Sequence, residues 1–359
     1  MKDHTQKSRK FSIGLDLGDR NSYVVGVTRE GEIVIEDKKV PTTRDAFRDY
    51  FSQFDRNTQV VCEAGTHSPW VSALLTSLGL KVIVANPNRA GRALAANGKK
   101  NDRLDSLTLA TMGLDSCSLH LLRPVKHRGD KAQADLAVIR ARSCAVAART
   151  QLINAVRGLV KSSGERLPSC SGAAFHRKVL DAVPEAVKPA VDPLIRQVGE
   201  LTSMIRAYDK TIEELSACYP ETKRLRAIAG VGPLIALAYV LTIDDPKRFR
   251  CSRDVGAYLG LVPKQWASGD SAPQLRITKA GDTYLRQLLV NGAHYILGPF
   301  GGDCELRRFG MRIGCRGGPK GKKRAVVAVA RKLAVIMHRL LLSGEPYDPF
   351  YRDSRRRSA

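Results

Sequence analysis

The sequence predicts an α/β domain followed by mainly helical regions, and three observations support this prediction. Up to residue 85, short apolar runs of strand length alternate with helical patterns. From residue 130 onward, apolar residues recur every three or four positions, as they do along helices. The 359 residues suffice for two or three domains, and the 43% of hydrophobic residues suffices for packed cores.

A β-hairpin opens the predicted α/β domain. Residues 11–17 and 22–28 read as strands joined by a turn, and Gly31 makes a second turn before a short strand at 33–35. A polar helix, a buried strand, an amphipathic helix and a last strand follow at residues 44–54, 59–63, 70–78 and 81–85. A hairpin followed by βαβ units gives a mixed sheet flanked by helices.

Four acidic residues of this domain are candidates for a metal site. Asp16 and Glu63 end two buried apolar runs, and ligands of such sheets bind beyond the strand ends. Asp102 and Asp105 share one face of a following helix because they are three positions apart. Carboxylate oxygens suit hard cations such as Mg²⁺, which retain water for a phosphate substrate, and Mn²⁺ is the expected substitute.

Each of these acids also has an ordinary structural interpretation. Asp102 fits the N-cap of its helix, and Asp105 fits a first turn, where the helix dipole favours acids. Asp16 fits a turn, and Glu63 fits an ion pair with a nearby arginine. Charged groups at the ends of buried runs are costly unless they are paired or bind metal, so Asp16 and Glu63 favour the functional interpretation more strongly.

The chain is strongly basic, and the charge is unevenly distributed. It has 59 Lys and Arg residues against 35 Asp and Glu residues, a net charge of +24. Counted by segment, residues 1–115 carry +3, residues 116–300 carry +11 and residues 301–359 carry +10. The acid-bearing domain is thus nearly neutral, and we expect the middle and C-terminal parts to bind a polyanion such as nucleic acid.

The cysteines and the hydropathy limit the class of protein. The eight cysteines show neither CxxC nor the Cys/His spacing of zinc sites, so we expect reduced thiols. The first ten residues lack an apolar signal core, and no segment is long and apolar enough to span a bilayer. We therefore expect a soluble, cytoplasmic protein with no membrane partner.

A long helical spacer is predicted next. Residues 130–161 follow a helical pattern, and a second helix carries a heptad seam. The seam consists of Leu194, Val198, Leu201, Ile205, Tyr208, Ile212 and Leu215. An internal αα-hairpin and an intermolecular coiled coil explain the seam equally well, and we favour a use in assembly.

The C-terminal third contains a turn that resembles a helix-hairpin-helix motif. Residues 228–234 place Gly230 and Gly232 between two apolar helices, where exposed amides can hold a DNA phosphate. A tight helical connection is the default interpretation of such a turn. Further candidate contacts to nucleic acid are the cations Lys279, Arg286, Arg307, Arg308, Lys322, Lys323 and Arg324.

A serine lies in a loop flanked by cations. Ser268 precedes a glycine, and such a serine is normally a turn residue. A nucleophilic serine needs a base or a metal to activate it, and no local Ser/His/Asp arrangement is visible. The residue types alone therefore leave the role of Ser268 open.

Short motifs follow one another in a distinctive order along nearly the whole chain. They are GLD at 14–16, EAGT at 63–66, NP at 86–87, KNDRLD at 100–105, AGVGP at 229–233, GLVP at 260–263, SG at 268–269 and TKAGDTYLR at 278–286. This order resembles the DEDD transposases and DNA invertases of the IS110 and Piv type. The resemblance implies an RuvC-like (ribonuclease H fold) domain at 1–120, a coiled-coil spacer at 121–220, a helical transposase domain at 221–345 and a basic tail at 346–359.

The resemblance also implies roles for individual residues. The four acids Asp16, Glu63, Asp102 and Asp105 would hold Mg²⁺, and Ser268 would form a covalent link to DNA. Relatives often continue the Ser-Gly pair with another glycine and a basic residue, whereas residues 270–273 read DSAP here, so Ser271 is a rival. The implied partners are donor and target DNA, a structured bridge RNA and further copies of the chain, as a dimer or tetramer with a composite active site.

Three other functions remain compatible with the sequence. An RuvC-like endonuclease would use the same acids for hydrolysis alone, without a covalent intermediate. An actin-like or sugar-kinase-like ATPase is suggested by residues 16–21, but a second glycine-rich phosphate loop is missing and +24 suits no small sugar substrate. A non-enzymatic nucleic-acid scaffold would have no use for the metal ligands.

Overall fold

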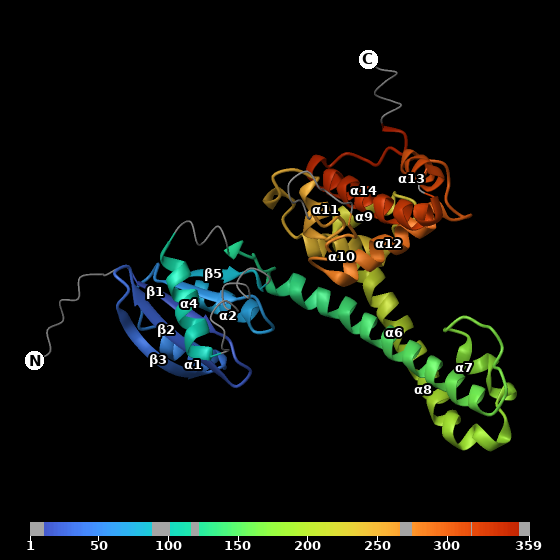
Figure 1. The fold of residues 1–359 in the computed structure, drawn as a ribbon, viewed down its shortest axis with the longest axis horizontal. Helices are drawn as coiled ribbons and strands as arrows, with labels where there is room; N and C mark the ends of the chain where they lie inside the picture. Colours follow the sequence, from blue (N-terminus) through green and yellow to red (C-terminus); the bar gives the residue numbers. More distant parts are fainter. Residues whose placement is uncertain (1–10, 88–100, 116–121, 266–274, 317, 352–359) are drawn as a thin grey trace, which may run out of the picture. The chain divides into compact units, whose positions relative to one another are not determined.

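The computed structural model describes residues 11–87, 101–115, 122–265, 275–316 and 318–351. The chain forms two compact units, Met1–Arg128 and Gly129–Ala359. The first unit is built on a sheet and the second is helical, so the predicted order of an α/β domain and helical regions is confirmed (Figure 1).

A five-stranded mixed sheet forms the first unit. Its strands are β1 (Phe11–Asp16), β2 (Asn21–Thr28), β3 (Ile33–Pro41), β4 (Gln59–Glu63) and β5 (Lys81–Ala85), in the spatial order β3-β2-β1-β4-β5. The strands β1, β2 and β3 form an antiparallel meander, and β4 and β5 extend it in parallel with β1. Parallel neighbours bring the carboxyl ends of β1, β4 and β5 to one edge.

Strand β3 is longer than expected. The sequence predicts a strand at 33–35, and the structure continues it to Pro41. This strand lies at the edge of the sheet, and most of its side chains are exposed. It therefore carries charged residues at positions where a half-buried strand would have an apolar residue at every second place. The apolar alternation on which the prediction rests is therefore absent over most of β3.

Helices cover both faces of the sheet. One face packs against α1 (Arg44–Phe51) and α2 (Ser68–Ser77) through a core that includes Ile13, Leu15 and Phe47. The other face packs against α4 (Asp102–Leu114), where Ala110 meets Val25 and Val27. Helix α1 ends three residues earlier than the predicted 54.

The second unit begins with a helical hairpin. Its long helices are α6 (Asp130–Ser162) and α8 (Lys188–Ala217), with the short helices α7 (Phe175–Lys178), η1 (Leu180–Ala182) and η2 (Glu185–Val187) between them. Helix α8 packs along α6, so the internal αα-hairpin interpretation of the heptad seam is confirmed. The hairpin tip has its own core, around Phe175 and Ile195.

The remaining helices pack around the base of that hairpin. They are α9 (Pro220–Arg226), α10 (Pro233–Ile243), η3 (Pro246–Arg248), α11 (Asp254–Tyr258), α12 (Thr283–Leu297), α13 (Glu305–Arg316), η4 (Gly318–Lys320) and α14 (Gly321–Ser343). Leu136 and Ile139 of α6 and Ile212 of α8 belong to the same core as these helices. The base of the hairpin and the C-terminal helices therefore form one body. Across the described ranges, none of the helices is apolar over a stretch long enough to cross a membrane.

Candidate active site

Two of the predicted acids lie on one face and at one edge of the sheet. Strands β1 and β4 are parallel with Leu15 opposite Cys62, so Asp16 and Glu63 follow at the same level. Side chains alternate between the faces of a strand, and Ile13 and Leu15 face the core of α1 and α2. Asp16 therefore points to the opposite face, the one that α4 covers.

The first turn of α4 lies over this edge. Gly14 lets the helix approach β1 directly, because a Cβ at this position would lie 1.8 Å from the Ser106 carbonyl oxygen. The Ser106 hydroxyl lies within hydrogen-bond distance of the carbonyl oxygens of Asp102 (2.9 Å) and Tyr23 (3.1 Å), and Tyr23 is the residue of β2 that pairs with Asp16. These contacts bring the helix turn that carries Asp102 and Asp105 towards Asp16.

Asn101 caps α4. Its side-chain oxygen accepts from the amide of Arg103 (3.0 Å), and its carbonyl accepts from the amide of Asp105 (2.9 Å). The N-cap interpretation of Asp102 is therefore wrong. Asp102 and Asp105 are both first-turn acids, at positions where the helix dipole stabilises their negative charge.

Cations border the acids on the meander side. Arg103 forms a salt bridge with Glu36 of β3 (3.1 Å), which ties the start of α4 to the edge strand. Lys39 lies opposite Tyr23 with its Nζ 5.0 Å from the ring centre. The interaction with the Tyr23 hydroxyl, and to a smaller extent the charges of Asp37 and Asp102, raises the pKa of Lys39 above its usual value.

All four predicted acids are half-buried, which suits ligands of a bound ion that stays open to a substrate. In a half-buried position, fewer water molecules compete with a cation for the carboxylate oxygens. A set of ligands made up of oxygens alone fits Mg²⁺. Within the described residues, however, no group of three or more His, Cys, Asp or Glu side chains is close enough to hold one ion. The structure places Asp16 and Glu63 at one edge and the first turn of α4 near it, and it does not assemble a closed metal site.

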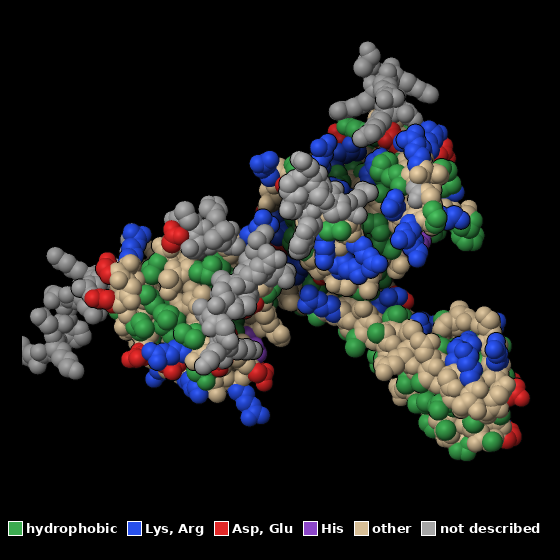
Figure 2. Space-filling model, in the orientation of Figure 1, with side chains coloured by type: hydrophobic (Ala, Val, Ile, Leu, Met, Phe, Trp, Pro, Cys, Tyr) green, Lys and Arg blue, Asp and Glu red, His purple; other side chains and the backbone are tan. Residues whose placement is uncertain are grey.

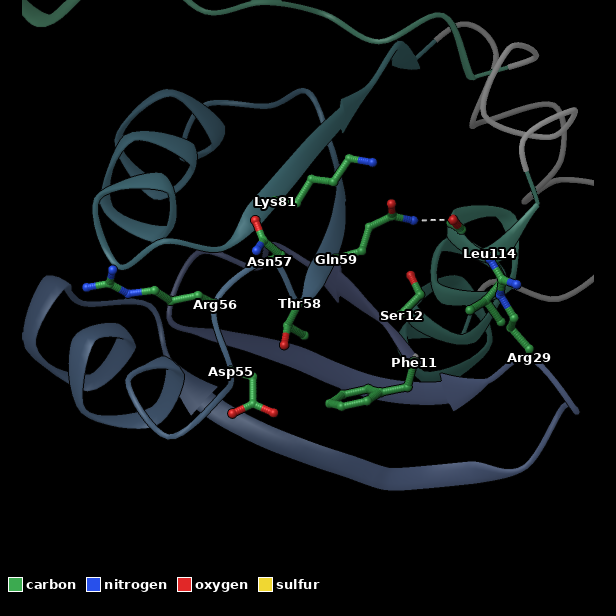
Figure 3. A pocket seen from close by; sticks show the side chains of 11 residues that line it. Phe11, Ser12, Arg29, Asp55, Arg56, Asn57, Thr58, Gln59, Lys81 and Leu114 are labelled. Carbon is green, nitrogen blue, oxygen red and sulfur yellow. Dashed lines mark hydrogen bonds between the residues drawn. The ribbon is translucent and has the colours of Figure 1, made fainter. Parts of the chain in front are cut away.

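A cavity of about 430 Å³ lies at the opposite edge of the sheet (Figure 3). It lies between the amino ends of β1, β4 and β5 and the C-terminal turn of α4, and Ser12, Lys81 and Leu114 line it. Gln59 donates a hydrogen bond to the carbonyl of Gly113 at its wall. The predicted acids do not line this cavity, so it is separate from the acid edge.

The serine candidates Ser268 and Ser271 lie outside the described residues, but the chain on either side of residues 266–274 is described. The amide of Lys264 donates to the carbonyl of Arg276 (2.9 Å), and the amide of Thr278 donates to the carbonyl of Val262 (2.9 Å). These bonds form a short antiparallel ladder with Pro263 opposite Ile277. The described segments on either side of residues 266–274 are therefore paired with each other.

The predicted contacts to nucleic acid divide into two groups. Lys279, Lys322, Lys323 and Arg324 are exposed, and so is Arg308, which forms an ion pair with Asp303 (2.6 Å). On the face drawn in Figure 2, Lys and Arg side chains gather over the helices that follow α8. This distribution agrees with the charge excess of the C-terminal segments.

Arg286 and Arg307 form the second group, in which the guanidinium donates hydrogen bonds to backbone carbonyls of the protein. Arg286 is 8% exposed and donates to the carbonyls of Leu259 and Ala280. Arg307 donates to the carbonyls of Ile296 and Gly298, both at 2.6 Å. These internal bonds give both guanidinium groups a structural role, and no composition signal distinguishes the two arginines from the exposed cations.

The turn at 229–233 connects α9 and α10 tightly. Gly230 has a φ of +82°, and a Cβ at this position would lie 2.9 Å from the Gly292 carbonyl and 3.1 Å from the Tyr295 ring. Gly232 is the N-cap residue of α10 and has no side chain to cover the first amides of the helix. Gly230 thus allows the turn to pack closely against α12, whereas Gly232 leaves the N-terminus of α10 accessible.

Comparison with known proteins gives a consistent set of similarities. A model of IS110-type DEDD transposases matches residues 13–164, and the model described as Transposase IS116/IS110/IS902 family matches residues 222–298. A probable family 20 transposase of Pseudomonas aeruginosa is 31% identical over 296 residues, which cover 79% of this chain and 83% of that protein.

Two further relatives extend the comparison. The transposase for insertion sequence element IS1111A of Coxiella burnetii is 28% identical over 345 residues, covering 93% of this chain and 90% of that protein. The pilin gene-inverting protein of Moraxella bovis is 28% identical over 167 residues, covering 45% of this chain and 50% of that protein. The similarity thus reaches proteins that move DNA segments and a protein that inverts one.

Proposed function

The chain belongs to the IS116/IS110/IS902 family of transposases, and from that premise we propose that it cuts and rejoins DNA in an Mg²⁺-dependent reaction through a phosphoserine intermediate. The observation that carries the proposal is the placement of Asp16 and Glu63 on one face and at one edge of the sheet, with α4 packed on β1 at Gly14, close to this edge. The mixed sheet of the first unit supports an RuvC-like fold for the domain that holds these acids.

Asp16, Glu63, Asp102 and Asp105 are the residues that would hold the metal. Bound there, Mg²⁺ would supply Lewis-acid stabilisation of a phosphate under attack, and Mn²⁺ would substitute. The protein's own contribution is to hold the carboxylates on two strand ends and one capped helix turn. The half-buried setting and the family relationship support this assignment.

Ser268 is the proposed nucleophile, with Ser271 as the rival. Its oxygen forms a bond to phosphorus while one bridging P–O bond breaks, and the leaving DNA oxygen takes up a proton to become a hydroxyl. The serine ester conserves the bond energy, so a second DNA hydroxyl can displace the serine without another energy source. A relative that inverts a pilin gene supports rejoining as well as cutting, since inversion requires both.

The exposed cations of the C-terminal helices are the proposed contacts to donor DNA, target DNA and a guide RNA. Lys322, Lys323 and Arg324 lie in the first turn of α14, which carries no acid. Cations at a helix N-terminus are disfavoured by the helix dipole, so folding alone gives no reason for three of them there. Neutralising nucleic-acid phosphates supplies such a reason.

Assembly through the helical hairpin is the proposed basis of a dimer or tetramer. Leu159, Leu180 and Met204 on the hairpin are 42%, 45% and 46% exposed. Contact with a second copy of the chain would remove this apolar surface from water, which favours association. The heptad seam itself is used inside the chain, so a second copy would contact these exposed residues.

A single reaction tests the proposed chemistry. Purified protein is incubated with donor DNA, co-expressed RNA and Mg²⁺, and protein-linked DNA is separated on a denaturing gel. We expect a covalent adduct that Ser268→Ala abolishes and Ser271→Ala leaves intact, with DNA binding unchanged in both variants.

Each alternative has its own outcome in this experiment. Loss of the adduct in Ser271→Ala alone would move the nucleophile to Ser271. Free DNA ends without any adduct, in the wild-type protein and in both variants, would replace the recombinase by a hydrolytic nuclease.

A further inference from the structure

The cavity at the amino edge of the sheet is lined by a row of polar side chains from neighbouring strands. Ser12 of β1 lies opposite Gln59 of β4, and Gln59 lies opposite Lys81 of β5. Residues in register on parallel strands point to the same face, which here is the face that α4 covers. Arg29 follows the end of β2, the strand on the other side of β1. All four residues line the cavity, so the row has a cation at each end.

The hydroxyl of Ser12, in the middle of this row, lacks a hydrogen-bond partner. Ser12 is 0% exposed, and its Oγ makes no hydrogen bond within the part of the chain that the structure describes. The side-chain amide of Gln59 donates to the carbonyl of Gly113 instead. Buried polar groups without a partner are rare in folded proteins because each one costs free energy. An acceptor oxygen of a bound ligand would supply the partner that the protein does not.

The two cations of the row have no acidic partner. Arg29 and Lys81 are exposed, and neither side chain forms an ion pair or a hydrogen bond with another described residue. In Figure 3 the Lys81 side chain extends towards Gln59, whereas the carboxylate of Asp55, which also lines the cavity, points away. Two cations that border one cavity repel each other, and a bound anion would replace this repulsion by attraction.

The size of the cavity and an aromatic ring at its wall indicate an organic ligand. The volume of about 430 Å³ lies in the range of pockets for small organic molecules, which is about 300–1,000 Å³. Phe11 lines the cavity and is partly exposed, and an edge contact with Phe54, at 6.1 Å between ring centres, supports its ring. Nucleic-acid bases stack on such rings. Cations together with an aromatic ring suit a nucleotide.

We propose that this cavity binds a nucleotide through its terminal phosphate. Lys81 and Arg29 bind the phosphate from the two ends of the row, and the Ser12 hydroxyl donates to one of its oxygens. Phe11 stacks on the base. A terminal phosphate carries nearly two negative charges and three strong acceptor oxygens, which match two cations and one hydroxyl. A free nucleotide and the terminal nucleotide of a strand present the same group.

This site is distinct from the acid edge. Asp16 lies four positions after Ser12 on β1, which is about 13 Å along the strand. Nucleotide binding therefore does not depend on the assignment of the metal ligands.

The C-terminal turn of α4 offers another explanation for the cations. Leu114 ends this helix and lines the cavity, and the helix dipole attracts positive charge to a C-terminus. That attraction alone would bind no nucleotide, and it would leave the Ser12 hydroxyl without a partner. Titration with a nucleotide separates the two explanations.

Isothermal titration calorimetry of the full-length protein provides the first test. Adenosine monophosphate should bind about 10-fold more tightly than inorganic phosphate, which lacks the base, and than adenosine, which lacks the phosphate. Lys81→Ala and Arg29→Ala should each weaken its binding by on the order of 10-fold, because each removes a charge-assisted hydrogen bond. Arg48→Ala is the matched control, since Arg48 is exposed on α1 and pairs with Asp45. It should keep the wild-type Kd.

Two further variants separate a ligand site from a structural role. Ser12→Ala removes a hydroxyl that makes no hydrogen bond within the described residues, so the free energy of unfolding should not fall. Its affinity for adenosine monophosphate should fall about 5-fold, because a hydrogen bond to the ligand is lost. Phe11→Leu should weaken the binding of adenosine monophosphate by about 10-fold and leave the Kd of inorganic phosphate unchanged.

Competition with adenosine monophosphate identifies the source of the nucleotide. Displacement by a 5′-phosphorylated dinucleotide, but not by the same dinucleotide with a 5′-hydroxyl, would assign the site to strand ends. Displacement by neither would assign it to free nucleotides. Failure of adenosine monophosphate to bind at millimolar concentration overturns the proposal. It is overturned equally if Lys81→Ala, Arg29→Ala and Ser12→Ala all bind with the wild-type Kd, because the nucleotide would then occupy another part of this basic chain.

Discussion

The acid edge of the sheet, where Asp16 and Glu63 lie, and the surroundings of Arg286 in the helical unit use polar side chains in opposite ways. At the acid edge, Asp16 and Glu63 are half-buried, and the backbone around them supplies the position. In the helical unit, the side chain of Arg286 is buried and itself holds the backbone in place, by donating to the carbonyls of Leu259 and Ala280. The first arrangement keeps its acids at a surface open to a ligand, and the second uses up its donors inside the protein.

The charged residues of this chain serve two different purposes. A net charge of +24 suggests that its arginines bind nucleic acid, yet Arg286 and Arg307 bind backbone carbonyls. Carbonyls left over at helix ends and turns need donors, and arginine supplies several at once. Some of the positive charge therefore holds the helical unit together, and the exposed remainder is available for the proposed contacts to phosphate.

The largest effect is expected from the acid edge. Asp16→Asn and Asp105→Asn keep the shape of the side chains but remove their charge, so cleavage should fall by on the order of 1000-fold, since metal-assisted stabilisation contributes several kcal/mol. DNA affinity should stay within about twofold, because the cations that bind phosphates lie elsewhere. Cleavage rates and a binding titration measure both.

Asp45→Asn is the matched control, because Asp45 is exposed on α1 and pairs with Arg48. It should leave cleavage unchanged. Cleavage at the wild-type rate by Asp105→Asn would remove this residue from the metal set.

The contact between α4 and β1 should give the next largest effect. Gly14→Ala places a methyl group where the Ser106 carbonyl oxygen lies 1.8 Å away, so the helix must move off the strand. We expect a loss of on the order of 3 kcal/mol in the free energy of unfolding of the first unit, together with loss of cleavage. Urea denaturation followed by circular dichroism measures the first, and the adduct assay the second.

Gly65→Ala is the control for this substitution, since nothing lies within 4 Å of a Cβ built at Gly65. It should behave as wild type. Equal stability of the two alanine variants would mean that α4 does not rest on Gly14.

The sequence predicts the acid edge better than it predicts the surroundings of Arg286. Strand alternation has a period of two, so the positions of Asp16 and Glu63 at the ends of apolar runs fix both their edge and their face. The approach of α4 depends on Gly14 meeting the carbonyl of Ser106, which is distant along the chain, and no local pattern specifies such an approach. Arg286 shows the same limit, because burial and partners are tertiary properties.

The heptad seam illustrates a second limit. Its spacing correctly predicts a helix with one apolar stripe, but the spacing is the same whether the stripe meets α6 or another copy of the chain. In the structure the stripe is covered within the chain, because Val198, Ile205 and Ile212 are all buried. The predicted length of β3 is wrong for a different reason. An exposed edge strand needs no alternation of apolar residues to be stable within its sheet.

The exposed cations should give a smaller, graded effect. Replacing Lys322, Lys323 and Arg324 by alanine one at a time should reduce the slope of log affinity against log salt by about 0.9 for each duplex phosphate that is no longer neutralised. Fluorescence anisotropy over a salt series measures the slope. Lys322→Arg keeps the charge and should keep the slope, and a slope that survives the triple alanine variant would place the phosphate-binding cations elsewhere.

The smallest expected effect concerns His338, a buried side chain that ties α14 to the segment before α11. Its Nε2 faces the carbonyl of Pro246 (2.9 Å) and so donates, which leaves Nδ1 to accept from the Ser252 hydroxyl (3.0 Å). Burial, with a smaller contribution from the charge of Arg248, lowers the pKa of His338 below its ordinary value of 6.5, against the raising effects of Pro246 and Asp254.

Because the folded-state pKa is lowered, the unfolded chain binds the proton more readily than the folded one. The stability that neutral His338 contributes is therefore fully present above pH 6.5 and is lost as the pH falls through and below that value. His338→Gln keeps one donor and one acceptor but does not titrate, so it should unfold with a weaker pH dependence between about pH 8 and pH 5. Urea denaturation of the second unit at both pH values decides the matter. Identical pH dependence in the two proteins would show that His338 is not the internal tie that its two hydrogen bonds indicate, and the contrast with the open acid edge would then depend on the arginines alone.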